Sequence, residues 1–348
     1  MRSMAVRPIA SRSGVRLPVS RAFERELAEL ESMSGHVPTA EGVGRIRKAL
    51  GNENNYLVSK AARLVAEYTL SELLPDVLSA FERFFEDPIK TDPQCWAKTA
   101  LAKALVKLDY RDADTYLRGL RHCQEEPVWG GQSDTAGALR GTCTQALVVC
   151  DGLSNARLLE LLLDPLVDSD KTVRMEAARA IGYAGGSAAS LLLKLRILVG
   201  KEEPEVLGSC FSALLGMDGE RNAAISLVAG LMDEEDEIAG EAALALAETH
   251  EPAALAALIA RRRRGTNSWL GSVLDQAIVL TRLPDAFDFL VSVIEREPRH
   301  AESALEAISR VPTSPEVRLQ VARAVARLQS DRISQAYRQF FPETGGDS

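Results

Sequence analysis

Side chains that could perform catalysis or bind a metal are few in this sequence and lie far apart. The histidines are His36, His122, His250 and His300, and the cysteines are Cys95, Cys123, Cys143, Cys150 and Cys210. No Cys-x-x-Cys pair and no histidine cluster occurs, so neither a zinc site nor a disulfide framework is expected. The sequence also contains no phosphate-binding loop and no Gly-x-Ser-x-Gly or His-Glu-x-x-His motif. We therefore expect no catalytic residue, no metal and no cofactor, and reduced thiols in a cytoplasmic protein.

The charge of the chain argues against a nucleic-acid coat. The 348 residues carry 41 Lys and Arg against 49 Asp and Glu, a net charge of −8, whereas phosphate backbones are bound by basic surfaces. Five arginines precede the first acidic residue, Glu24: Arg2, Arg7, Arg12, Arg16 and Arg21. We interpret residues 1–22 as a flexible basic arm, with a targeting segment as the alternative. No apolar run of about 18 residues occurs, so no membrane span is predicted.

A two-helix pattern recurs along the chain. In its clearest copy, residues 156–186, a leucine stripe and a polar turn precede a second helix with apolar residues at offsets 0, +4, +5 and +8. Eight such rows, about 31 to 43 residues apart, begin at Leu57, Trp96, Leu139, Val173, Val206, Ile238, Trp269 and His300. Units of this kind bury their apolar faces by stacking on their neighbours. The pattern predicts an all-α fold, a right-handed α-solenoid of about eight helix pairs.

The unit that contains Asp170, Val173, Arg174 and Ala177 resembles the HEAT-repeat family of armadillo-type folds, in its short phycobilisome-lyase form. This resemblance implies that Asp170 and Arg174 belong to a ladder that braces the turns. It also implies that the second helices line the concave side of a superhelix. HEAT motifs specify a fold and almost no chemistry.

The same pattern divides the chain. We expect the HEAT-like solenoid to cover residues 23–342, with its clearest repeats at 154–311 and a terminal cap at 313–342. A disordered tail is expected at 343–348. The segment 125–134 is predicted to be the longest loop within a repeat, and no strand is expected.

Four of the eight rows carry glycine at offset +2, which is costly inside a helix because each glycine loses about 1 kcal/mol relative to alanine. These glycines are Gly141, Gly208, Gly240 and Gly271, followed at +3 by Thr142, Ser209, Glu241 and Ser272. Two interpretations remain open. The strip of small residues is either a groove where a partner backbone approaches closely, or a device that lets helices of the chain pack tightly.

The turns between paired helices carry mostly acidic residues, and one of them reverses sign. An acidic turn at 233–237 is followed by the basic run Arg261, Arg262, Arg263 and Arg264. The first interpretation is that this run pairs with the acidic turn of the neighbouring repeat. The alternative is a charged edge that orients a basic or bipolar protein partner.

The function predicted from these features is that of a non-enzymatic scaffold or adaptor. It binds a protein partner through the concave second-helix surface and the charged turn edge. The alternative is a HEAT-like enzyme similar to alkylpurine DNA glycosylases or to phycobilin lyases. A deoxyhypusine hydroxylase is not expected, because His250 and Glu251 form a single His-Glu pair. Trp96 and Trp269 lie in the anchor column and are interpreted as core residues.

Overall fold

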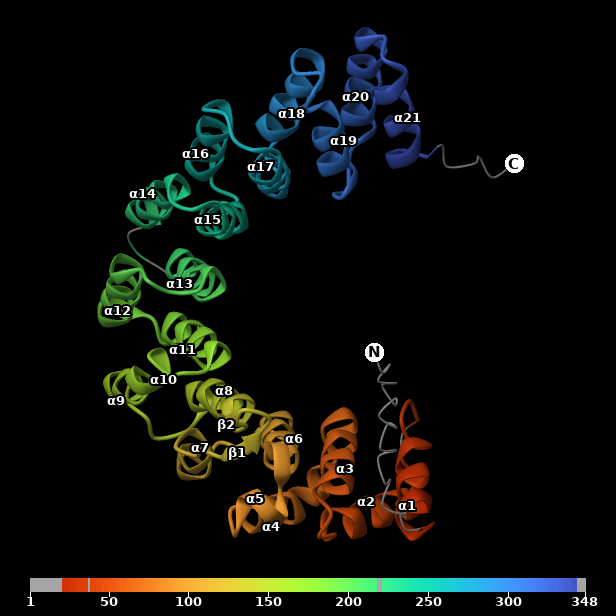
Figure 1. Cartoon of the computed structure of the whole chain (residues 1–348), viewed down its shortest axis with the longest axis vertical. Helices are drawn as coiled ribbons and strands as arrows, with labels where there is room; N and C mark the ends of the chain where they lie inside the picture. The colour runs from red at the N-terminus through yellow and green to blue at the C-terminus, as the bar shows by residue number, and fades with distance from the viewer. Residues whose placement is uncertain (1–20, 37, 218, 220, 343–348) are drawn as a thin grey trace, which may run out of the picture. The chain divides into compact units, whose positions relative to one another are not determined.

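The structure is a computed structural model that describes residues 21–36, 38–217, 219 and 221–342 (Figure 1). These residues form 21 α-helices, four short 3-10 helices and two short strands, with 74% of the structure helical. The predicted all-α class is therefore confirmed. Of the predicted basic arm, residues 1–20 lie outside the described residues, whereas Arg21 begins the first helix. The tail expected at 343–348 also lies outside them.

The chain divides into two compact units. Among the described residues, unit 1 comprises those up to residue 110 together with 122–139, and unit 2 comprises 111–121 and those from residue 140 onward. The helices of unit 1 are α1 (Arg21–Glu31), α2 (Ala40–Leu50), α3 (Asn55–Tyr68), η1 (Ser71–Leu73), α4 (Leu74–Arg83), α5 (Pro88–Thr91), η2 (Pro93–Cys95) and α6 (Trp96–Lys107). Helix α3 packs on α1, α2 and α6, and α4 packs on α2 and α6.

A β-hairpin in unit 1 corrects the prediction that residues 125–134 form a loop. Strand β1 (Glu125–Val128) pairs antiparallel with β2 (Gly131–Asp134), and Val128 lies opposite Gly131. The two-residue connection is Trp129 and Gly130, and Gly130 has a φ of +94°, a conformation that glycine adopts without strain. Trp129 is fully exposed at the tip. The sequence Trp-Gly-Gly is typical of a turn, but the prediction from the two-helix pattern did not take it into account.

Unit 2 contains most of the helices. They are α7 (Ala113–Leu120), η3 (Leu147–Val149), α9 (Asn155–Leu161), α10 (Leu163–Leu166), α11 (Lys171–Ala184), α12 (Gly186–Val199), α13 (Pro204–Gly216), α14 (Arg221–Gly230), η4 (Leu231–Asp233), α15 (Asp236–Glu248), α16 (Pro252–Arg263), α17 (Ser268–Leu280), α18 (Pro284–Arg296), α19 (Ala301–Ser309), α20 (Pro315–Leu328) and α21 (Asp331–Phe340). Helix α8 (Gly137–Ala146) contains the boundary between the units.

The helices of unit 2 contact one another in an alternating order. Successive second helices are neighbours, α11 with α13, α13 with α15, α15 with α17 and α17 with α19. The intervening helices α12, α14, α16 and α18 each pack on the second helix that follows them. Figure 1 shows these two sets of helices on either side of unit 2. Each second helix therefore touches the equivalent helix of the next row.

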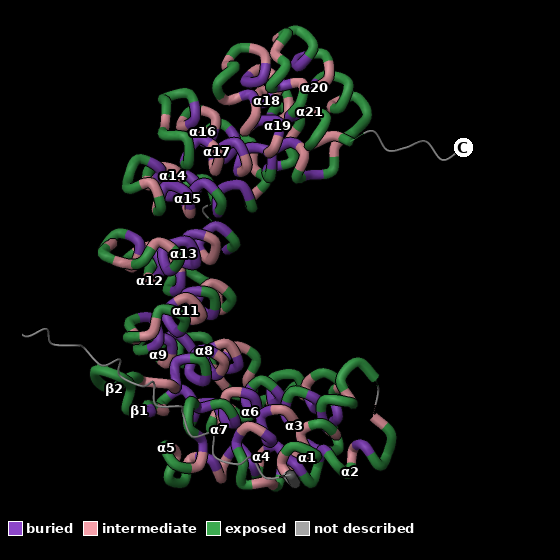
Figure 2. Tube along the Cα trace, turned by 45° about the vertical axis from the view of Figure 1, so that its right-hand side comes forward, coloured by how far each residue is buried: buried purple, intermediate pink, exposed green. Residues whose placement is uncertain are grey.

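The repeated apolar columns form the core. In all eight rows the residues at offsets +5 and +8 are buried, from Ala62 and Val65 in α3 to Leu305 and Ile308 in α19. Figure 2 shows such buried positions in purple along the helices. Several of these helices have a polar N-cap residue. In α11 the N-cap is Asp170, whose carboxylate accepts hydrogen bonds from two backbone N–H groups. Local periodicity and capping thus place these helices as predicted.

Two expectations about the rows are wrong. Trp96 and Trp269 are not core residues, because 49% and 51% of their surfaces are exposed. The anchor position lies in the first helical turn, where an indole is too large to be fully covered by the neighbouring helix. The leucine stripe at 158–166 is also not one helix. It breaks at Leu162 into α9 and α10, since Pro165 lacks the N–H that would bond to Leu161.

Candidate functional site

The glycine column of the second helices is covered by side chains of this chain. A methyl group added at Gly141 would lie 3.5 Å from Glu176 Cγ, and one at Gly240 would lie 3.1 Å from Trp269 Cη2. At Gly208 the added group would overlap the carboxyl group of Glu241. In each case the covering side chain comes from the next second helix. The glycines therefore let neighbouring rows pack closely, which supports the packing interpretation over an open groove for a partner backbone.

The remaining residues of this strip differ in exposure. A methyl group at Gly271 would meet Thr266 Oγ1 at 3.0 Å, a contact from the turn before its own helix. Ser209 is buried, and its hydroxyl donates to the backbone oxygen of Glu205 at 3.0 Å. Thr142 and Ser272 are half-buried. The predicted strip of small residues is therefore not continuously accessible, because Ser209 is buried.

Beside the covered glycines lies a cavity of about 400 Å³ in unit 2. It is bordered by three successive second helices, with Pro204 and Glu205 from α13, Glu237, Gly240, Glu241 and Leu244 from α15, and Trp269 and Val273 from α17. Two of these residues, Gly240 and Glu241, belong to the predicted site. The exposed half of Trp269, which sequence reasoning assigned to the core, forms part of the wall.

The cavity holds a carboxyl group without a partner. Among the described residues, no hydrogen bond or ion pair involves the side chain of Glu241. Burial, and secondarily the charge of Glu205, raise the pKa of Glu241. Glu205 itself is paired with Lys171 at 2.9 Å, which holds the pKa of Glu205 below its ordinary value. The cavity therefore combines an apolar wall with a carboxyl group that lacks a counter-ion.

A matched position in another row shows the usual arrangement. Glu176 occupies the same +3 column and lies over Gly141 as Glu241 lies over Gly208. Unlike Glu241, Glu176 is paired within its own helix with Arg179, three residues later, at 2.6 Å. The equivalent position after Glu241 is Leu244. The row at α15 thus keeps the carboxyl group and lacks the arginine.

Replacing Glu241 with glutamine is expected to stabilise the protein at neutral pH. Because the folded protein raises the pKa of this carboxyl group, folding favours its protonated form, and wild-type stability falls as the pH rises above the ordinary carboxyl pKa. The Glu241→Gln variant lacks this loss, so its advantage in thermal unfolding should grow as the pH rises above the ordinary carboxyl pKa of about 4. The control Glu176→Gln loses an ion pair and should give no such gain. Parallel pH profiles for wild type and Glu241→Gln would contradict the prediction.

The arginine run serves mainly internal contacts. Arg264 pairs with Asp233 at 2.9 Å, and Arg261 lies 3.5 Å from the same carboxylate. The predicted pairing of this run with the acidic turn is thereby confirmed. The guanidinium of Arg263 lies over the ring of Phe289, 5.5 Å from its centroid. These contacts leave Arg263 and Arg264 exposed, and 55% of the Arg264 side chain is accessible to solvent.

Arg262 was wrongly included among the partner-binding residues. It is 5% exposed, and its Nε donates to Asp275 Oδ1 at 2.8 Å inside unit 2. Asp275 is fully buried and accepts a second hydrogen bond from the Ser303 hydroxyl at 2.9 Å. Arg262 lies on the side of α16 that faces α17. It is therefore an internal residue, although its neighbours Arg263 and Arg264 are exposed.

Arginines in two successive rows brace the turns that follow them. Arg140 makes two hydrogen bonds to the Asp168 carboxylate, at 2.7 and 2.8 Å. Arg174 binds Glu202 at 3.0 Å and also donates to the backbone oxygen of Asp168 at 2.6 Å. The bracing ladder implied by the HEAT resemblance is present through Arg174, while Asp170 acts as a helix cap.

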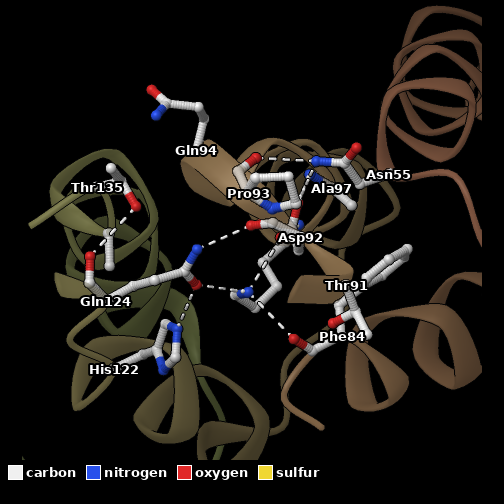
Figure 3. Close-up of polar contacts among 12 residues, drawn as sticks. Asn55, Phe84, Thr91, Asp92, Pro93, Gln94, Ala97, His122, Gln124 and Thr135 are labelled. Atoms are coloured by element: carbon white, nitrogen blue, oxygen red, sulfur yellow. Dashed lines mark hydrogen bonds and ion pairs between the residues drawn. The ribbon is translucent and has the colours of Figure 1, made fainter. Parts of the chain in front are cut away.

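Sequence reasoning missed a buried polar cluster in unit 1 (Figure 3). Its centre is Lys98 on α6, a fully buried side chain. The Lys98 ammonium group lies 3.0 Å from Asp92 Oδ2 and donates to Gln124 Oε1 at 3.0 Å and to the Phe84 backbone oxygen at 3.1 Å. Asp92, also fully buried, accepts hydrogen bonds from Asn55 and from the first backbone N–H groups of α6.

The same cluster fastens the hairpin to α6. Gln124 donates through Nε2 to the backbone oxygen of Asp92 at 2.8 Å and to Glu126 at 2.7 Å. Glu126 also accepts from the Gln94 backbone N–H and the Thr135 hydroxyl, and hydrogen bonds of this kind lower its pKa although burial opposes them. The polar groups of the cluster satisfy one another, so its role is to hold unit 1 together rather than to bind a ligand.

Neither the histidines nor the cysteines assemble a reactive site in the described part of the chain. No group of three or more His, Cys, Asp or Glu side chains there could hold a metal ion. Cys95 and Cys210 are buried free thiols, and Cys143 is also buried. Burial raises the pKa of both Cys95 and Cys210 to about 12, which keeps them protonated and unreactive. Within the same residues, no helix has the length and apolar character needed to cross a membrane.

Comparison with known proteins gives no family assignment. No protein-family model and no curated protein matches the chain. Among solved structures, an engineered protein matches with 16% identity and a TM-score of 0.36, over 93% of this chain and 96% of the other. Human deoxyhypusine hydroxylase in complex with glycerol matches with 16% identity and a TM-score of 0.29, over 75% of this chain and 89% of the other.

Proposed function

We propose that this chain is a non-enzymatic, cytoplasmic scaffold or adaptor of the HEAT-repeat type, a right-handed α-solenoid of about eight helix pairs that binds a protein partner. Its binding surface is formed by the second helices, and the cavity between α13, α15 and α17 is the centre of that surface. The observation that carries this proposal is Trp269, a half-exposed tryptophan in the wall of a cavity that holds an unpaired carboxyl group.

The chemistry of the cavity favours binding over catalysis. Tryptophan is among the residues that contribute most to protein interfaces when a partner covers it. The residues that line the cavity include no serine, cysteine, histidine or lysine that could act as a nucleophile. The free thiols elsewhere in the chain favour a reducing compartment, in agreement with the proposed cytoplasmic location.

The glycosylase-like alternative is less well supported. An enzyme of that kind needs an aromatic and an acidic residue on a basic surface that attracts the phosphate backbone. Trp269 and Glu241 provide the first two features, but Glu205 and Glu237 add further carboxyl groups and no basic residue lines the cavity. The local charge repels a nucleic acid, so a protein partner fits the site better.

Site-specific photo-cross-linking in the native cell tests this function. A photoreactive amino acid at Leu244, in the cavity wall, should yield a discrete cross-linked protein. The same residue at Leu319, an exposed leucine of α20, is the matched control and should not. Addition of Trp269→Ala to the Leu244 probe should remove the product while circular dichroism stays unchanged. A folded Leu244 probe that cross-links no more than the Leu319 control would overturn the proposal.

A further inference from the structure

We infer that the cavity between α13, α15 and α17 binds the cationic side chain of a lysine or arginine from a basic segment of the protein partner. This inference rests on the proposed function and names the chemistry of the partner at the same site. It follows from three observations. The cavity is negatively charged, its wall contains an aromatic residue, and the arginine that pairs with the equivalent glutamate in the α11 row is absent from the α15 row.

The charge of the cavity is negative and uncompensated. Three glutamates line it, Glu205, Glu237 and Glu241, without any lysine or arginine among the lining residues. Glu205 is compensated by Lys171 from α11. In the described part of the chain, Glu237 and Glu241 have no ion pair or hydrogen bond through their side chains. A cation entering the cavity therefore meets two carboxyl groups that have no counter-ion.

The aromatic and apolar walls of the cavity also suit a lysine or arginine side chain. Trp269 is 51% exposed, and tryptophan is the aromatic residue that attracts cations most strongly over its face. Pro204, Leu244 and Val273 provide apolar surface, against which the methylene stem of lysine or arginine packs while its charged end stays near the carboxyl groups. An anionic or purely apolar side chain would leave either the carboxyl groups or the tryptophan face unmatched.

The α11 row shows how this chain itself satisfies the same carboxyl position. There Glu176 receives the guanidinium of Arg179 from one helical turn away, at 2.6 Å. In α15 the residue at that distance from Glu241 is Leu244, which borders the cavity. The cavity thus lies where an internal cation is missing, and a partner side chain can take its place.

A titration followed by NMR tests the inference with small probes. The indole N–H signal of Trp269 is identified by its loss in Trp269→Phe, since the chain has three tryptophans. Nα-acetyl-lysine methylamide and Nα-acetyl-arginine methylamide, whose side chains keep their positive charge, should shift this signal saturably. Nα-acetyl-norleucine methylamide has an aliphatic side chain without the charge and should not shift it. Glu241→Gln should weaken binding of the charged probes about tenfold, and the control Glu176→Gln should leave it unchanged.

A gain-of-cation variant gives a second, independent readout. Leu244→Arg restores the spacing of Glu176 and Arg179, so its own guanidinium should occupy the site and abolish probe binding in a folded protein. If the charged probes cause no saturable shift, or if norleucine binds equally well, the inference is overturned. If the inference is overturned in this way but a protein is still cross-linked at Leu244, the proposed function stands. If the charged probes bind but no protein is cross-linked at Leu244, the proposed function alone is overturned.

Discussion

Replacement of Asp92 with alanine is expected to destabilise unit 1 by about 3–5 kcal/mol, because it leaves a buried ammonium group without its counter-ion. Lys98 and Asp92 are both fully buried, 3.0 Å apart. The same substitution removes the carboxylate that caps α6 through the backbone N–H groups of Ala97 and Lys98. A loss of this size is a large part of the stability of a typical domain.

Hydrogen exchange of the full chain, read by mass spectrometry, measures this loss locally. Peptides from α3 and α6 should exchange much faster in Asp92→Ala, since α3 contributes Asn55 to the same carboxylate. The control Lys90→Ala changes an exposed residue of the neighbouring α5 and should cost less than about 0.5 kcal/mol.

A second variant tests whether the Asp92 carboxylate contributes more to stability than the Lys98 ammonium group. Lys98→Met removes the buried cation, yet Asp92 keeps its hydrogen bonds to Asn55 and to the start of α6. The loss in Lys98→Met should therefore be smaller than in Asp92→Ala. Equal or greater destabilisation by Lys98→Met would show that the ammonium group, rather than the carboxylate, organises the cluster.

The sequence predicted the helical rows because the signal for them is local. Burial at offsets such as +4, +5 and +8 is a property of one helix, and Val173, Ala177, Ala178 and Ile181 show it within little more than two helical turns. Prolines mark helix starts in the same local manner, as at Pro252 of α16. These features need no knowledge of the neighbouring helices.

The buried ions were not predictable in this way. A periodic pattern treats every lysine and arginine as solvent-facing, but Lys98 binds Phe84 and Gln124, which lie 14 and 26 residues away in the chain. Arg262 stands among three other arginines, and only its position on the inner side of α16 distinguishes it. Such partners are set by the packing of separate helices, which periodicity does not encode.

The candidate site was predicted in part. The glycine column led to Gly240 and Glu241, since a costly glycine inside a helix indicates a close contact. The contact itself was unforeseen, because the side chains over Gly208 and Gly240 come from the next row. Trp269 was assigned to the core because its column is apolar elsewhere. Which face of that indole stays open depends on the size of the neighbouring side chains, and the cavity therefore emerged only from the structure.

Loss of Arg262 is expected to have the second large effect, a destabilisation of unit 2 by about 3–5 kcal/mol in Arg262→Ala. The carboxylate of Asp275 would then be buried with a single hydrogen bond, from Ser303. Burial already raises the pKa of Asp275 although Arg262 opposes it. Without Arg262 this pKa rises further, so the deficit of the variant should shrink at low pH, where Asp275 takes up a proton.

Thermal unfolding and hydrogen exchange of α17, each at about pH 5 and about pH 7, measure this effect. The control Arg264→Ala breaks the exposed pair with Asp233 and should cost less than about 1 kcal/mol. The double variant Arg262→Met with Asp275→Asn removes both charges and keeps an acceptor for Ser303, so it should recover most of the loss. A double variant as unstable as Arg262→Ala would show that neutralising Asp275 is not the main contribution of Arg262 to stability. A destabilised Arg264→Ala would instead place the main electrostatic support at the exposed turn.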